Sequence, residues 1–151
     1  MAATILIADD YEDNLELLRF LLTAAGYQVK EARNGQECLT QALAQLPDLI
    51  MIDLSMPILD GWEVFGQLKT NELTARIPCV AVTAFGESDR YRALETGFDA
   101  YLSKPFRGTE LLETVAQLLA LRHPPTSQSP TLKKTITAPE PQLDFPSEPV
   151  F

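Results

Sequence analysis

Acidic residues stand directly after two of the apolar runs in this sequence. Asp53 ends the run LIMID, in which residues 49–52 are all apolar, and Asp9 and Asp10 follow the run TILIA. A carboxylate at such a place can act as a nucleophile or as a ligand for a hard cation. Three carboxylates brought into one small site repel one another, so such a site needs a cation such as Mg²⁺ unless some of them are protonated.

A hydroxyl and an ammonium group follow two further apolar runs. Thr83 ends the run IPCVAVT, and Lys104 follows the run AYLS. A lysine and a divalent cation together neutralise the oxygens of a phosphoryl group, and a threonine hydroxyl can donate a hydrogen bond to one of them. The set therefore fits phosphoryl transfer, which depends on positioning and charge neutralisation.

Each of these residues has an ordinary structural interpretation when it is taken alone. Asp9 and Asp10 could simply cap a helix, Thr83 could be one more strand residue, and Lys104 could be a solvated lysine. Asp53 is harder to explain in this way, because it ends a wholly apolar run. The functional interpretation depends on all of them occupying equivalent places at the ends of predicted strands.

The elements that would position these residues alternate between short apolar runs and longer amphipathic ones. We expect strands over residues 4–8, 27–31, 49–53, 77–83 and 100–103. We expect helices over residues 12–25, 35–46, 61–70, 87–96 and 109–121. Runs such as LIMI and VAV are apolar on both faces, which indicates a parallel sheet covered by helices on each side. In such doubly wound sheets the ligand site lies at the carboxyl ends of the strands.

Several local features predict where helices begin, end and pack. Gly26 is a natural stop for the first helix, and Asn34 can cap the second. Asp60 has no partner at a strand end, so we interpret it together with Gly61 as the turn into the third helix. The apolar positions of the second helix that we expect to face inward are Leu39, Ala42, Leu43 and Leu46.

Composition excludes several classes of function. The net charge of −9 argues against binding to nucleic acid or to an anionic membrane, both of which need basic patches. A single histidine, His123, rules out a Ser-His-Asp triad and a histidine-rich zinc site. Cys38 and Cys79 have no metal-binding spacing, so we expect buried, reduced thiols. No run reaches the roughly 18 apolar residues of a membrane span, and we expect a soluble cytoplasmic protein.

The end of the chain differs from the rest in composition. Seven of the 11 prolines lie in residues 124–151, and this stretch shows no sustained hydrophobic period. It cannot bury enough apolar surface to offset the entropy lost on ordering. We therefore expect a folded domain over residues 1–122 and a flexible, proline-rich tail over residues 123–151.

The motifs ILIADD, IDLSMPILDGWE, VTA and YLSKPF, in this order and spacing, resemble the receiver domain of two-component response regulators. The resemblance covers residues 3–122 and implies a flavodoxin-like α/β fold, a doubly wound (βα)5 sheet of five parallel strands in the order 2-1-3-4-5. It implies that Asp53 accepts the phosphoryl group and that Lys104 binds it. Thr83 and Tyr101 match the switch pair, and the Lys104–Pro105 bond matches one that is cis in the family.

The resemblance also implies a metal site and a signalling role. Asp9, Asp10, Asp53 and the backbone carbonyl of Ser55 match the groups that bind Mg²⁺. A histidine kinase or a His phosphotransfer protein would supply the phosphoryl group. A downstream protein would then bind the face formed by residues 87–121, and a homodimer through that face is left open. On this interpretation the protein is not an enzyme and binds neither nucleic acid nor membrane directly.

Two other functions are open at this point. Our main expectation is a stand-alone receiver that signals by binding a partner, because a DNA-binding output domain would need roughly 50 or more further residues. The first alternative is a receiver that passes its phosphoryl group on to a His phosphotransfer protein. A Mg²⁺-dependent phosphatase with an aspartate nucleophile ranks much lower. Phosphatases of that type carry DxD after the first strand, whereas this sequence has ADDYED there.

Overall fold

The computed structural model of the chain describes residues 2–84 and 87–122. It divides into two units, residues 1–119 and residues 120–151. Only residues 120–122 of the second unit are among those described, as the end of the last helix. The tail expected over residues 123–151 lies outside the described residues, so the domain boundary stays a prediction.

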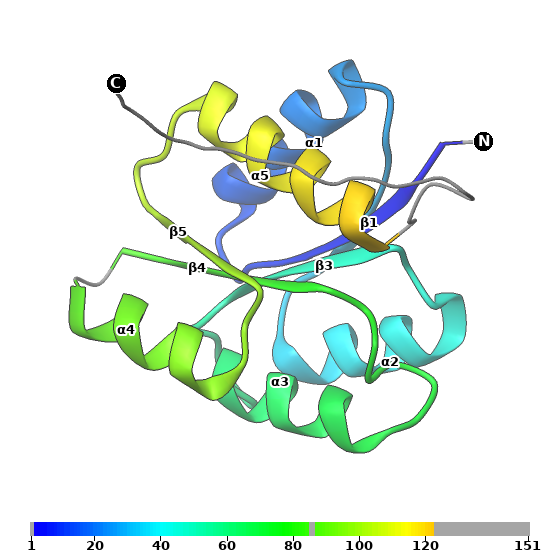
Figure 1. Ribbon diagram of the computed structural model, residues 1–151, viewed down its shortest axis with the longest axis vertical. Coiled ribbons are helices and arrows are strands. Elements are labelled where there is room, and N and C mark those ends of the chain that lie inside the picture. Colours follow the sequence, from blue (N-terminus) through cyan, green and yellow to red (C-terminus); the bar gives the residue numbers. More distant parts are fainter. Residues whose placement is uncertain (1, 85–86, 123–151) are drawn as a thin grey trace, which may run out of the picture. The chain divides into compact units, whose positions relative to one another are not determined.

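Strands and helices alternate along the first unit, as the sequence predicts. The strands are β1 (Thr4–Ala8), β2 (Gln28–Ala32), β3 (Leu49–Asp53), β4 (Cys79–Thr83) and β5 (Ala100–Ser103). The helices are α1 (Glu12–Ala24), α2 (Gly35–Gln45), α3 (Gly61–Thr70), α4 (Glu87–Thr96) and α5 (Gly108–Arg122). Within the described residues the strands pair in parallel in the order β2-β1-β3-β4-β5, which confirms the expected fold class. Figure 1 shows α1 and α5 on one side of the strands and α2, α3 and α4 on the other.

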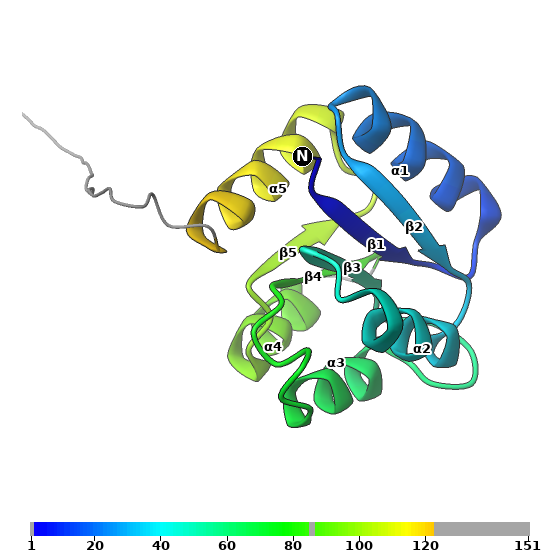
Figure 2. The same ribbon diagram turned by 90° about the vertical axis from the view of Figure 1, so that its right-hand side faces the viewer.

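Helices cover both faces of the sheet, as Figure 2 shows. On one face, alternate residues of β1, β3, β4 and β5 pack with Leu15, Leu18 and Leu22 of α1 and with Leu111 and Val115 of α5. On the other face, the remaining strand residues pack with α2, α3 and α4. Every residue of β3 and of β4 is buried, because both of their faces are covered. The sheet is therefore a rigid frame for the residues at its carboxyl edge.

Two of the predicted strands had wrong boundaries. β2 starts and ends one residue later than predicted, because the Tyr27 N–H bonds to Leu22 O in the turn after α1. β4 starts at Cys79 rather than Ile77, since Pro78 has no N–H to donate and the Ile77 N–H bonds to Thr74 O. Neither shift moves a residue of the candidate site.

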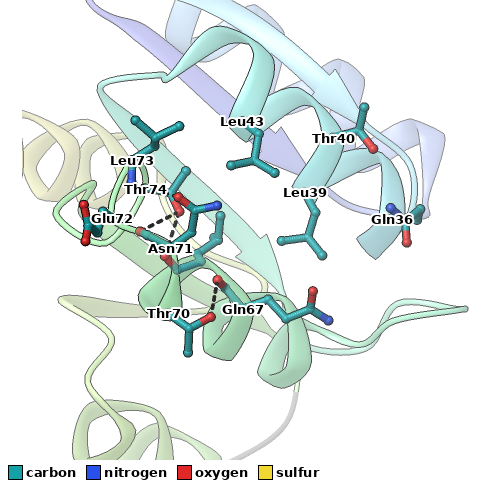
Figure 3. A pocket seen from close by; sticks show the side chains of 11 residues that line it. Gln36, Leu39, Thr40, Leu43, Gln67, Thr70, Asn71, Glu72, Leu73 and Thr74 are labelled. Atoms are coloured by element: carbon teal, nitrogen blue, oxygen red, sulfur yellow. Dashed lines mark hydrogen bonds between the residues drawn. The ribbon is translucent and has the colours of Figure 1, made fainter.

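The prediction that Leu43 and Leu46 face inward was also wrong. Their side chains are 42% and 46% exposed, whereas Leu39 and Ala42 are buried. Leu43 lies beside a hollow of about 640 Å³ between α2 and the segment after α3 (Figure 3), so part of its surface stays in contact with water. Leu46 lies past the end of the helix, where its left-handed backbone (φ 46°, ψ 65°) turns the chain away.

The predicted cap at Asn34 and the predicted stop at Gly26 are confirmed, and Asp60, predicted only as part of the turn into α3, is a helix cap as well. Asn34 accepts a hydrogen bond from the Glu37 N–H at the start of α2. Asp60 and Glu63 form a capping box at the start of α3, in which each side chain accepts from the other's backbone N–H. Gly26 follows α1 with φ +100°, a conformation that favours glycine. In the described residues no helix is long and apolar enough to cross a membrane.

We expect Cys38 and Cys79 to resist thiol reagents in the native protein. Both are free and fully buried, and burial raises the pKa of each thiol to about 12. At pH 8 only about one thiol in ten thousand would then be the reactive thiolate. Ellman's reagent should label neither cysteine before unfolding and both in guanidinium chloride. Native labelling as fast as in the denatured control would contradict the buried packing.

Candidate functional site

The carboxyl edge of the sheet brings three carboxylates together. Asp9 follows β1 and is 1% exposed, Asp53 ends β3 and is 5% exposed, and Asp10 is exposed beside them. Oxygen atoms of the three side chains lie within 4.8 Å of one another. The sequence predicted this cluster from the convergence of strand ends at one edge of the sheet, and the pairing of β1 with β3 brings Asp9 and Asp53 together there.

Lys104 supplies a positive charge to this cluster. Its Nζ donates to Asp9 Oδ2 at 2.9 Å and to Asp53 Oδ2 at 3.2 Å. The backbone of Lys104 is held beside the end of β4, because its N–H donates to Thr83 O at 2.8 Å. The Lys104–Pro105 bond is cis, as the resemblance implied. Burial lowers the pKa of Lys104, but the hydrogen bond to Asp9 and the charges of Asp53 and Asp9 outweigh it, so the pKa is raised overall.

The other oxygens of the two buried carboxylates are also held. Asp53 Oδ1 accepts from the Ser55 N–H at 2.9 Å. Asp9 Oδ1 accepts from the Tyr11 N–H at 2.9 Å, and Asp9 Oδ2 also accepts from Asn14 Nδ2 at 3.2 Å. Asn14 was not among the predicted site residues, although its place in the first turn of α1, five residues after Asp9, could have indicated it.

Burial makes the negative charge at Asp53 costly. It raises the pKa of Asp53 from 3.8 to about 6, and the charge of Asp9 adds to this rise. The Ser55 N–H and Lys104 oppose it without cancelling it. Lys104 bonds two of the three clustered carboxylates, Asp9 and Asp53, so one ammonium group faces three acidic side chains. Their oxygen atoms are ligands of the kind that Mg²⁺ prefers. The site fits a divalent cation on its donor chemistry and on its excess negative charge.

Two further predicted residues lie on the strands next to the cluster. Thr83 ends β4 and is 1% exposed, and it pairs with Ser103 of β5. Tyr101 pairs with Ala81 and is half-buried against the core on the α2, α3 and α4 side of the sheet. Both carry further interactions with the rest of the protein.

The hollow beside α2 is separate from the carboxylate cluster. Its lining comes from α2, from the end of α3 and from the turn that follows, and Leu39 and Leu43 point toward it (Figure 3). It contains none of the predicted site residues. The chemistry that the sequence predicted is therefore concentrated at the strand ends rather than in this hollow.

Comparisons with known proteins agree with this arrangement. Residues 5–116 match a family described as the response regulator receiver domain. The chain is 41% identical over 119 residues to the response regulator PleD of Caulobacter vibrioides, covering 78% of this chain but only 26% of PleD. It is 38% identical over 120 residues to the polar-differentiation response regulator DivK of Brucella anthropi, covering 79% of this chain and 98% of DivK.

A solved structure gives the same result. The receiver domain of the sensor histidine kinase PA1611 from Pseudomonas aeruginosa PAO1 superposes with a TM-score of 0.74 and 29% identity. The match covers 80% of this chain and 99% of that one. In that crystal structure a magnesium ion is coordinated in the active-site cleft.

Proposed function

The chain belongs to the response regulator receiver domain family, and from that premise we propose that a histidine kinase phosphorylates it on Asp53. Receivers of this family are signalling domains of two-component systems. The observation that carries the proposal is the position of Lys104 Nζ, which bonds both Asp9 and Asp53 at the edge of the sheet. An ammonium group there can bind a phosphoryl oxygen once Asp53 has been modified.

We propose that Mg²⁺ binds Asp9, Asp10, Asp53 and the backbone carbonyl of Ser55. The clustered carboxylate oxygens support this assignment, because three acidic side chains lie together and Lys104 supplies a single positive charge to them. When bound, the ion supplies positive charge that stabilises the phosphoryl oxygens during transfer.

The transfer step follows from the chemistry of Asp53. With a pKa of about 6, its side chain is mostly ionised at neutral pH and can act as the nucleophile. A carboxylate oxygen of Asp53 attacks phosphorus, an O–P bond forms, and the bond from phosphorus to the donor nitrogen breaks. That bond's electron pair leaves with the imidazole of the kinase. After the transfer, Lys104 bonds the phosphoryl oxygens, and this contact replaces its hydrogen bond to the unmodified Asp53.

The signal would pass from the strand ends to a partner-binding face. In the proposal the Thr83 hydroxyl bonds the new phosphoryl group, and Tyr101 turns inward. The face formed by residues 87–121 then changes its affinity for a downstream protein or for a second copy. The outcome is altered binding rather than turnover of a small substrate. We propose cytoplasmic action, where the two thiols would stay reduced.

We expect the protein to gain one phosphoryl group from acetyl phosphate, and only with Mg²⁺ present. Intact-mass spectrometry after incubation should show one added phosphoryl mass with Mg²⁺ and none with excess EDTA. Hydroxylamine, which cleaves acyl phosphates, should remove the added mass. Equal labelling in EDTA would contradict the metal assignment, and a hydroxylamine-resistant product would contradict an aspartyl phosphate.

A further inference from the structure

An ion pair joins the segment that follows β1 to the loop that follows β2, at the carboxyl edge of the sheet. Arg33, directly after β2, donates from Nε to Glu12 Oε1 at 2.9 Å and from Nη2 to Glu12 Oε2 at 3.0 Å. Glu12 is the first residue of α1, two positions beyond Asp10. The pair is bidentate, a geometry that fixes both partners more firmly than a single contact does.

Arg33 is anchored on its own side of this pair. Its backbone N–H donates to Glu37 Oε1 at 2.9 Å, and the next residue, Asn34, caps α2. Its guanidinium also donates to Glu31 Oε1 at 3.2 Å. The preceding residue, Ala32, is fully buried in β2. These contacts keep Arg33 in position, so that its guanidinium can hold Glu12.

The start of α1 has no side-chain cap. Tyr11 occupies the capping position, and its side chain makes no capping hydrogen bond. The turn between Asp9 and Glu12 presents Asp10, the one exposed carboxylate of the cluster. Asp9 fixes one end of this turn through the Tyr11 N–H, and the pair with Arg33 fixes the other end. Among the described residues, that pair is the side-chain bridge from Glu12 to the β2–α2 loop.

We propose that Arg33 is a positioning residue for the Mg²⁺ site, acting through Glu12 on the turn that presents Asp10. The inference rests on the proposed function and adds a residue that touches neither metal nor phosphoryl group. The backbone just before Arg33 lies beside the cluster, because Ala32 O accepts a hydrogen bond from the Asp9 N–H at 3.1 Å. The charge of Arg33 and its positioning effect would change Mg²⁺ affinity in opposite directions, which permits a test of sign. If Arg33 acted only through its charge, its removal would strengthen Mg²⁺ binding, because a cation near the site repels a dication. If it positions Asp10, its removal weakens binding.

The test is a Mg²⁺ titration of the full chain by isothermal calorimetry at constant ionic strength, without a phosphodonor. Arg33→Ala should weaken Mg²⁺ binding by about two- to fivefold, the upper part of the range that an exposed ion pair contributes. Arg19→Ala is the matched control: Arg19 is 44% exposed against 47% for Arg33, and both guanidinium groups bond Glu31, whereas of the two only Arg33 has a described ion pair with Glu12. Arg19→Ala removes the same charge as Arg33→Ala, so the Mg²⁺ affinity of this control should equal or exceed that of the wild type.

A double-mutant cycle separates positioning from general destabilisation. In a Glu12→Ala background the bridge is already absent, so Arg33→Ala should cause no further weakening. Thermal unfolding of each variant confirms that it is folded at the temperature of the titration. If Arg33→Ala binds Mg²⁺ as tightly as Arg19→Ala does, or weakens binding equally in both backgrounds, the inference is wrong. Failure of the wild type to bind Mg²⁺ would instead overturn the proposed metal site itself.

Discussion

Replacing Asp53 with asparagine is expected to reduce labelling by acetyl phosphate at least about a hundredfold, because an amide is a far poorer nucleophile than a carboxylate. The variant keeps the shape of the side chain and its place at the end of β3. It removes the charge that Lys104 contacts at 3.2 Å. Intact-mass spectrometry under identical phosphodonor and Mg²⁺ concentrations measures the effect. Labelling of the variant at the wild-type rate would place the phosphoryl group on another residue.

Asp60→Asn is the matched control for this experiment. Asp60 is also an aspartate of the segment after β3, but its Oδ1 accepts from the Glu63 N–H at 2.9 Å as the cap of α3. Asparagine caps a helix about as well as aspartate does. Asp60→Asn should therefore fold and become phosphorylated as the wild type does, and only a loss confined to Asp53→Asn supports the acceptor assignment.

Stability provides a second check on Asp53→Asn. The pKa of Asp53 is about 6 in the fold and 3.8 for the free side chain, so between these values the folded state binds more protons than the unfolded state. Without metal, this group makes the wild type less stable as the pH rises from about 4 to about 6. The neutral asparagine lacks this loss. The variant should thus be no less stable than the metal-free wild type at pH 7, and lost labelling could not be attributed to unfolding.

Much of this site could be predicted because the carboxyl ends of parallel strands lie at the same edge of a sheet, independently of the conformation of the loops. β3 and β4 are apolar throughout, so their ends at Asp53 and Thr83 could be recognised without a structure. The order of the strands then brings Asp9 beside Asp53. The site residues whose positions depend only on the order and direction of the strands were therefore predicted correctly as neighbours.

The contacts that could not be predicted depend on side-chain reach between loops. Arg33 and Glu12 are 21 residues apart, and no period or motif links them. Asn14 reaches Asp9 because α1 begins at Glu12, which places Asn14 in the first turn of the helix beside the end of β1. The exposure of Leu43 depends on the width of the hollow beside α2, which is a property of helix packing. Sequence patterns specify which face of an element is apolar but not how closely neighbouring elements approach.

Two glycines of α3 illustrate that limit, and substitution by alanine should affect them in opposite directions. A Cβ atom at Gly61 would lie 2.6 Å from Asp53 O and 2.7 Å from Leu54 Cα, both backbone atoms that cannot simply rotate away. A Cβ atom at Gly66 would meet nothing within 4 Å. We expect Gly61→Ala to lower the free energy of unfolding by about 2–3 kcal/mol, the cost of overpacking. Gly66→Ala should raise it by about 0.5–1 kcal/mol, because alanine favours the helix.

Urea unfolding of the two variants and the wild type measures both effects, and the slope with denaturant shows whether the transition stays two-state. The pair shares element, substitution and added volume, so helix propensity alone predicts the same sign for both. A stabilised Gly61→Ala variant would mean that the segment between Asp53 and α3 can move away at little cost. A destabilised one means that α3 is held directly against the strand end that carries Asp53, and that this close approach requires glycine.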